Sequence, residues 1–249
     1  MQTDVNASHI LFAVAEKAPP ADTLKAYKKA MDVRNKILKG LDFEKAAKSF
    51  SDDKSAINNG GSLGYFTVFM MVYPFENAAY NTEIGKISKP VRTKYGYHLI
   101  KVNDKRKANG EVKVAHIMFK LAKDASEEAI SIGKTKIEEI AAKIKNGEDF
   151  SDLAKQFSED RATAVKGGNI PWFGVGKMVK EFENAAFSLQ SIDERRAPFK
   201  TDFGWHIVKL LEKRPILSFK KMKDELKKKV KQDSRNALRD KALISKIKK

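Results

Sequence analysis

The chain has 249 residues, a hydrophobic content of 42% and a formal net charge of +17 at pH 7. This length suits one large domain or two ordinary ones, and the composition is sufficient to build cores. The lack of cysteine excludes disulfides, thiolate nucleophiles and cysteine-based zinc sites, and no run approaches the ~18 apolar residues of a membrane span.

The first elements in chain order are a strand and two helices. Residues 9–14 form a short apolar run, which predicts a buried strand. Asp22 is a plausible N-cap for a helix that runs to about residue 39. Asp42 can cap a second, short helix over residues 43–50.

Two further strands and one helix complete this region. Residues 63–66 follow a Gly-Gly turn and predict a short strand, and residues 75–80 predict a short helix. In the last strand His98, Ile100 and Val102 share one face. The order strand, helices, strand, helix, strand predicts an α+β domain with a mixed or antiparallel sheet.

The same pattern occurs twice. Residues 7–80 match residues 114–187 without a gap, and about a third of the positions are identical. One inserted residue then changes the spacing from 107 to 108, so that Gly96-Tyr97-His98 recurs as Gly204-Trp205-His206. A period near 100 residues indicates duplicated domains, because the units of solenoids are 20–50 residues long. We expect domains at 1–106 and 107–214, joined by a polar linker over 103–113, and a basic tail at 215–249.

All four histidines of the chain occupy matched repeat positions. His9 and His98 lie on the first and last strands of the first copy, and His116 and His206 on those of the second. If these strands are adjacent at the centre of each sheet, each pair meets face to face. The pairs can be satisfied core histidines or part of an active site, whereas a metal site lacks an evident third ligand.

An ordered set of motifs resembles the parvulin peptidyl-prolyl isomerases. Each copy contains a His-Ile strand, a Phe-Ser-Asp or Phe-Ser-Glu segment, a Gly-Gly turn before an aromatic strand, a Met, a Phe-Glu-Asn-Ala-Ala helix and a Gly-aromatic-His strand. The resemblance implies two tandem parvulin (FKBP-like) domains. Each would be a small, mostly antiparallel sheet surrounded by helices, and a C-terminal helix would follow.

The resemblance also implies the site residues. The polar residues, which would steady the carbonyl as it rotates, are His9, Asp53, Thr93 and His98 in the first copy, and His116, Asp160, Thr201 and His206 in the second. The proline pocket would be formed by Leu63, Phe66, Met71 and Phe75, and by Ile170, Phe173, Met178 and Phe182. The alternative for Asp53 is an ordinary polar residue after a helix, and a Met or Phe at helical spacing is usually core. The family needs no metal or cofactor.

Two features depart from the pattern. Pro171 replaces the Gly64 of the first copy, which restricts the backbone and removes an N–H at the edge of the second pocket. Residues 69–73 are more apolar than an exposed loop should be.

The tail carries most of the net charge, since residues 212–249 hold 15 Lys or Arg and 5 Asp or Glu. After a plausible N-cap at Ser218, Phe219, Met222, Leu226 and Val230 form a narrow apolar stripe. This stripe could dock on the second domain. Alternatively, it could belong to a chaperone module like that of the SurA-like periplasmic foldases, which the tandem arrangement resembles.

That resemblance implies proline isomerisation in the folding of exported proteins, with unfolded or proline-containing polypeptides as clients and a periplasmic location. The export signal is absent here, so we expect a trimmed form of a longer protein. A non-catalytic peptide-binding chaperone is the alternative, and a polyanion binder that uses the tail is a third. We expect no specific nucleic-acid partner, and the oligomeric state is open.

Overall fold

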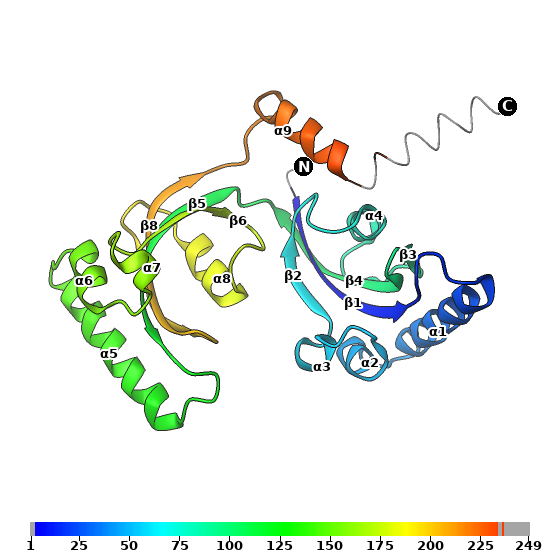
Figure 1. The fold of residues 1–249 in the computed structure, drawn as a ribbon, viewed down its shortest axis with the longest axis horizontal. Coiled ribbons are helices and arrows are strands. Elements are labelled where there is room, and N and C mark those ends of the chain that lie inside the picture. The colour runs from blue at the N-terminus through cyan, green and yellow to red at the C-terminus, as the bar shows by residue number, and fades with distance from the viewer. Residues whose placement is uncertain (1–2, 234–235, 237–249) are drawn as a thin grey trace. The chain divides into compact units, whose positions relative to one another are not determined.

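The computed structural model describes residues 3–233 and 236, which fall into two compact units. Of the described residues, the first unit takes in 3–108 together with 217–233 and 236, and the second takes in 109–216. Each unit holds one four-stranded sheet with flanking helices (Figure 1). The predicted α+β class and the tandem arrangement are confirmed.

The first sheet has the strand order β2-β1-β4-β3, and all neighbours are antiparallel. In chain order, the elements are β1 (Thr3–Ala13), α1 (Pro20–Leu38), α2 (Phe43–Phe50), α3 (Ala56–Asn59), β2 (Ser62–Phe66), α4 (Tyr73–Asn81), β3 (Val91–Thr93) and β4 (Gly96–Lys107).

The second sheet repeats this topology as β6-β5-β8-β7. Its elements are β5 (Glu111–Lys120), α5 (Glu127–Lys145), α6 (Phe150–Phe157), α7 (Arg161–Ala164), β6 (Asn169–Gly174), α8 (Lys180–Ser188), β7 (Arg195–Thr201) and β8 (Gly204–Arg214). A further helix, α9 (Phe219–Gln232), follows.

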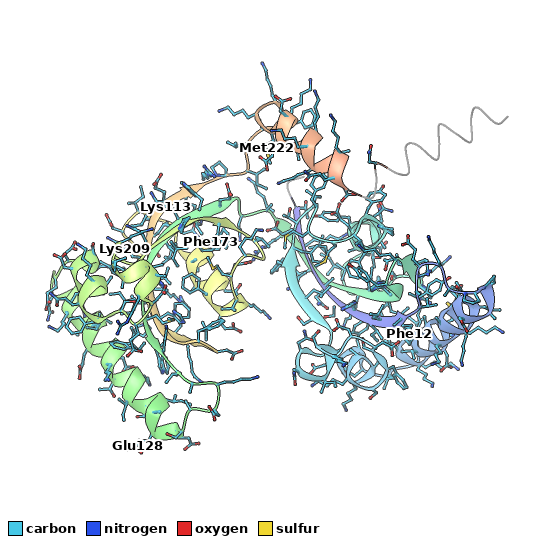
Figure 2. The ribbon with its side chains drawn as sticks, in the orientation of Figure 1. Phe12, Lys113, Glu128, Phe173, Lys209 and Met222 are labelled. Carbon is cyan, nitrogen blue, oxygen red and sulfur yellow. The ribbon has the colours of Figure 1, made fainter. Side chains whose placement is uncertain are left out.

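Side chains alternate between the two faces of each sheet along its central strands, so each face needs packing partners. In the first unit Ile10, Phe12 and Leu99 pack against α1 and α2 on one face, and Phe12 is marked in Figure 2. Ala7 and Ile100 pack on the other face with the α4 residues Phe75 and Ala79. In the second unit Ile117 and Ile207 pack against α5 and α6, as Ile10 and Leu99 pack against α1 and α2 in the first.

The predicted caps of the short helices are present. The Lys45 N–H donates to the Asp42 carboxylate at 2.9 Å, and the Asp152 N–H donates to that of Asp149 at 3.0 Å. The cap predicted at Asp22 was wrong. The helix begins earlier, at Pro20, because a proline at the first helical position needs no N–H partner.

The predicted linker was too long. Strand β4 continues to Lys107 and β5 begins at Glu111, so only residues 108–110 lie between the strands. The polar residues remain in the sheet because Thr3 pairs with Lys107 and Glu111 with Arg214. Backbone pairing therefore extends beyond the apolar part of each strand.

The tail helix carries the predicted apolar stripe in part. Leu226 is buried, whereas the Phe219 side chain is 69% exposed. Residues 217–233 group with the first unit and not with the second, which disfavours docking on the second domain, one of the two possibilities left open by the sequence. The tail residues after 233, except 236, lie outside the described part of the chain.

Among the residues that the structure describes, none of the helices combines the length and apolar character of a membrane span.

Candidate functional site

The two central strands of the first sheet bring His9 and His98 onto the same face. Leu11 of β1 pairs with His98 of β4, and His9 pairs with Ile100, so the two histidines are diagonal neighbours. In the second sheet Met118 pairs with His206, and His116 pairs with Val208. The strands that carry each histidine pair are therefore adjacent, which is the condition under which the sequence indicated that the pairs would meet.

The repeated Gly-Gly turn fixes the backbone of the first histidine. Gly61 has a φ of +78°, and its carbonyl accepts a hydrogen bond of 2.9 Å from the His9 N–H. A Cβ at Gly61 would lie 2.2 Å from the His9 carbonyl oxygen. Only glycine combines this conformation with such a close approach. Gly168 has the same relationship to His116.

The polar residues of the first domain form one continuous hydrogen-bonded chain. The His9 Nδ1 and His98 Nδ1 atoms are 3.3 Å apart, and the Thr93 hydroxyl lies 2.8 Å from His98 Nε2. At the other end, His9 Nε2 lies 2.9 Å from Asp53 Oδ2. All four predicted polar residues of the first copy are therefore in contact.

The contacts of Asp53 and Thr93 determine which atom donates and which accepts in each of these hydrogen bonds. An ionised Asp53 accepts the His9 Nε2 proton, which leaves Nδ1 of a neutral His9 as an acceptor. His98 then donates from Nδ1, and its Nε2 accepts from the Thr93 hydroxyl, whose oxygen in turn accepts the Tyr95 N–H at 3.2 Å. Each N–H or O–H proton of these hydrogen-bonded side chains is therefore donated within the group.

The electrostatics of the site agree with two neutral histidines. Burial lowers the pKa of His9 below its ordinary value, although the bond to Asp53 acts in the opposite direction. Burial and the nearby His9 lower the pKa of His98 to about 4. Burial alone would raise the pKa of Asp53, but its hydrogen bonds to Ser55 and His9 outweigh this effect and hold the pKa below its usual value.

An apolar group lies directly against this chain. The ring of Phe75 meets His98 edge-on at 5.3 Å between centroids and His9 at 5.8 Å. Leu63 and Met71 pack, partly exposed, in the same cluster. Phe66 is fully buried beside Phe75, so it supports the pocket from behind and does not form its surface.

The second domain has the same Asp–His and Thr–His contacts as the first, but it lacks the hydrogen bond between the two histidines. His116 Nε2 lies 2.8 Å from Asp160 Oδ2, and the Thr201 hydroxyl lies 2.8 Å from His206 Nε2. The two imidazoles are nearly parallel with centroids 5.9 Å apart. Both Nδ1 atoms are buried, and neither has a hydrogen-bond partner among the described residues. The second histidine pair is therefore not joined directly.

Two substitutions between the copies accompany this difference. Phe199 stacks on His206 with centroids 5.5 Å apart, whereas the matching position of the first domain is Val91. Thr163 replaces Ala56, and its hydroxyl contacts both His116 Nε2 at 2.9 Å and Asp160 Oδ2 at 2.6 Å. Burial lowers the pKa of His206 to about 4, as it does that of His98.

The second site opens into an apolar cavity of about 500 Å³. Six of the predicted residues line this cavity, namely His116, Asp160, Ile170, Met178, Phe182 and His206. Phe173 of β6 (Figure 2) lies behind Phe182 with centroids 6.2 Å apart, and Thr201 contacts His206 without lining the cavity.

Sequence reasoning missed the remaining lining residues, which are Met118, Thr163, Lys177, Val179 and Phe203. A signal for Phe203 was present, since Tyr95 occupies the matching position and both aromatic side chains are more than half exposed. Pro171, the departure noted in the second copy, lies in the edge strand β6, where a missing N–H disturbs no inner ladder.

Within the described residues, no group of three or more His, Asp or Glu side chains is arranged to hold a metal ion. The fold and the site define a class of small α+β domain in which apolar side chains lie against a pair of buried, neutral histidines.

Comparison with known proteins specifies this class. The family model described as "PPIC-type PPIASE domain" matches the chain twice, at residues 1–106 and 103–214. The chain belongs to this family, the parvulin-type peptidyl-prolyl isomerases, and carries two of its domains. The resemblance seen in the motifs is confirmed.

Curated relatives match most of this chain. The protein named Chaperone SurA from Nitrosococcus oceani is 35% identical over 212 residues, which cover 83% of this chain and 49% of the relative. Its namesake from Pseudomonas syringae pv. tomato is 34% identical, with coverage of 86% and 50%. The chain thus spans about half the length of these relatives. A solved structure of PrsA from Bacillus cereus is 36% identical, with a TM-score of 0.40, and the match covers 50% of this chain and 43% of that one.

Proposed function

We propose that both domains accelerate the cis–trans isomerisation of Xaa–Pro bonds in polypeptide clients by binding the prolyl ring in the apolar pocket. The observation that carries this proposal is the position of Phe75 and Phe182, each set edge-on against both imidazoles of its domain. Membership of the peptidyl-prolyl isomerase family supports the reaction class.

The energetics of the reaction suit such a site. Rotation about an Xaa–Pro bond faces a barrier of ~18–20 kcal/mol because amide resonance must be broken. A rate gain of about 10⁴ requires only ~5.5 kcal/mol of selective transition-state stabilisation. The twisted amide is less polar than the planar one, so a dry aromatic pocket favours it. No covalent intermediate is needed.

We infer that the histidine chain of the first domain positions the pocket and does not transfer protons. Its donors are all directed along the chain, from Thr93 through the histidines to Asp53, so none is left to donate to the substrate carbonyl. Neutral imidazoles held in this way form a rigid wall of low charge for the prolyl ring. Carbonyl contacts by these residues, the other role that the resemblance implied, would require the chain to open.

A peptide assay on the full chain tests the proposal. Met71 and Met178 are partly exposed, so M71A and M178A remove contact with the prolyl ring at little risk to folding. We expect each variant to lower the kcat/KM of its own domain by about tenfold, which corresponds to ~1.4 kcal/mol. The double variant should lose most of the catalysed rate. A wild-type chain that is folded but gives no acceleration would refute the proposal.

A non-catalytic peptide-binding chaperone is the second candidate function. The relatives' name, Chaperone SurA, favours it, and the unjoined histidine pair of the second domain distinguishes that domain from the first. Suppression of aggregation of a proline-free unfolded client tests this role. Undiminished suppression by the double methionine variant would assign it to a surface outside the proline pockets.

We propose that the clients are unfolded or proline-containing segments of exported proteins and that the protein works in the periplasm. Both proposals rest on the likeness to the SurA chaperones. We further propose residues 1–106 and 107–214 as the two folding units, followed by a basic tail over 215–249, of which residues 217–233 group with the first unit. Expression of each segment alone, followed by cooperative thermal unfolding, tests these bounds.

A further inference from the structure

The loop before α8 places a lysine at the edge of the second pocket. Lys177 lines the same cavity as Met178, Phe182 and His206, and its side chain is exposed. Among the described residues, no ion pair involves Lys177. Its ammonium group is therefore available to a ligand that enters the cavity.

The first domain holds the equivalent loop in the same conformation. The N–H of Gly176 donates to Glu183 Oε2 at 2.6 Å, and the N–H of Phe69 donates to Glu76 Oε2 at the same distance. Gly176 and Phe69 also share the left-handed conformation, with φ values of +75° and +68°. The residue that follows in each loop therefore occupies an equivalent position in the two domains.

That next residue is Met70 in the first domain and Lys177 in the second. The Met70 sulfur accepts a hydrogen bond of 3.3 Å from the Thr67 N–H, so the first loop presents an uncharged side chain beside the half-buried Phe69. The second loop presents a cation beside a glycine.

The nearby acidic group does not cancel this difference, because both sites contain it. Asp53 contacts His9, and Asp160 contacts His116 in the same way. Any repulsion of an acidic substrate by this carboxylate acts equally in the two domains. Among the residues that line the second cavity, Asp160 and Lys177 carry the formal charges, and Met70 takes the position of Lys177 in the first domain.

We propose that Lys177 makes the second domain selective for prolines flanked by an acidic residue, whereas Met70 makes the first domain prefer prolines flanked by an apolar residue. This inference rests on the proposed function. It divides client recognition between two pockets of one chain, so that segments of different charge are bound by different domains.

Peptide titrations of the full isotope-labelled chain test this proposal, because amide signals of residues 3–108 and 109–216 report binding to each domain separately. The probes are short peptides with Glu-Pro, Pro-Glu, Leu-Pro or Lys-Pro at their centre. We expect one of the two Glu peptides to bind the second domain about two- to fivefold more tightly than the Leu-Pro peptide, the effect of one exposed ion pair. The preference should shrink at 1 M salt, where the screening length is about 3 Å.

The substitution K177M removes the positive charge and should abolish this preference, whereas M70K should create it in the first domain. K134Q removes an equal charge from α5, which packs on the opposite face of the second sheet, and should change nothing. An unchanged preference in K177M, or equal affinity for the Glu and Leu-Pro peptides in the wild-type second domain, would overturn the proposal. Failure of every proline peptide to bind would instead refute the proposed function.

Discussion

The imidazoles of His9 and His98 are joined through their Nδ1 atoms at 3.3 Å, whereas the same atoms of His116 and His206 have no partner among the described residues. The two domains share their fold, the register of the central strands at the histidines, and the Asp–His and Thr–His contacts, so the cause must lie in local packing. Phe199, which stacks on His206 where the first domain has Val91, is the bulkiest difference next to the pair.

Exchange of these two residues should exchange the state of the histidine pairs. In F199V, removal of the ring should let His206 approach His116, so that a hydrogen bond forms between their Nδ1 atoms. V91F should separate His9 from His98. The ¹⁵N chemical shifts of the imidazole nitrogens report both changes in the full chain. An unchanged pattern in both variants would show that Phe199 does not set the spacing.

Stability should decrease as the pH falls from about 6.5 to about 4. The pKa of His98 and that of His206 are about 4 in the folded chain, against an ordinary value of 6.5. Between these limits the unfolded state binds more protons than the native state, so acid favours unfolding. For His98 alone the loss approaches about 3 kcal/mol at pH 4. Urea unfolding at several pH values measures it.

The double variant H98N/H206N should flatten this pH dependence, whatever its absolute stability, because the two most perturbed groups are gone. A slope equal to that of the wild type would assign the acid sensitivity to other groups. Peptide isomerisation by the wild type should meanwhile vary little between pH 6 and 8, because His98 and His206 stay neutral there.

Alanine substitutions should separate close contact from backbone strain at two glycines, Gly61 of the Gly-Gly turn and Gly64 of β2. Gly61 and Gly64 both have positive φ, but only a Cβ at Gly61 meets the His9 carbonyl, whereas one at Gly64 meets nothing within 4 Å. G64A should cost about 1 kcal/mol from the left-handed conformation, and G61A at least about 2 kcal/mol more, because the backbone must shift. Equal losses of unfolding free energy would argue against a tight contact.

Phe203 should contribute to substrate binding although the motif pattern did not indicate it. Its ring is 59% exposed and lines the second cavity. F203A should therefore leave the thermal midpoint almost unchanged and weaken peptide binding to the second domain about three- to tenfold, the usual effect of one aromatic contact. A large loss of stability with unchanged affinity would give Phe203 a structural role instead.

The sequence was sufficient to predict the duplicated fold and the polar residues. The gap-free repeat predicted the duplicated fold, and the matched histidines indicated that each pair would meet if the first and last strands were adjacent. The remaining polar residues, such as Asp53 and Thr93, came from the resemblance to the parvulins. The residues that the sequence did not indicate lie where contacts depend on three-dimensional packing. Thr163 reaches His116 from the helix after Asp160, and Phe199 reaches His206 across a strand pair whose register shifts. Strand ends were also misjudged, because backbone pairing continues through polar residues such as Lys107.

The central claim is that the prolyl ring occupies the slot beside each histidine pair. Intermolecular NOEs between the ring protons of a bound Leu-Pro or Glu-Pro peptide and the methionine methyl groups test it most directly. The account predicts NOEs to Met71 in the first domain and to Met178 in the second, and their loss in the alanine variants. NOEs from the proline only to residues outside both pockets would contradict it.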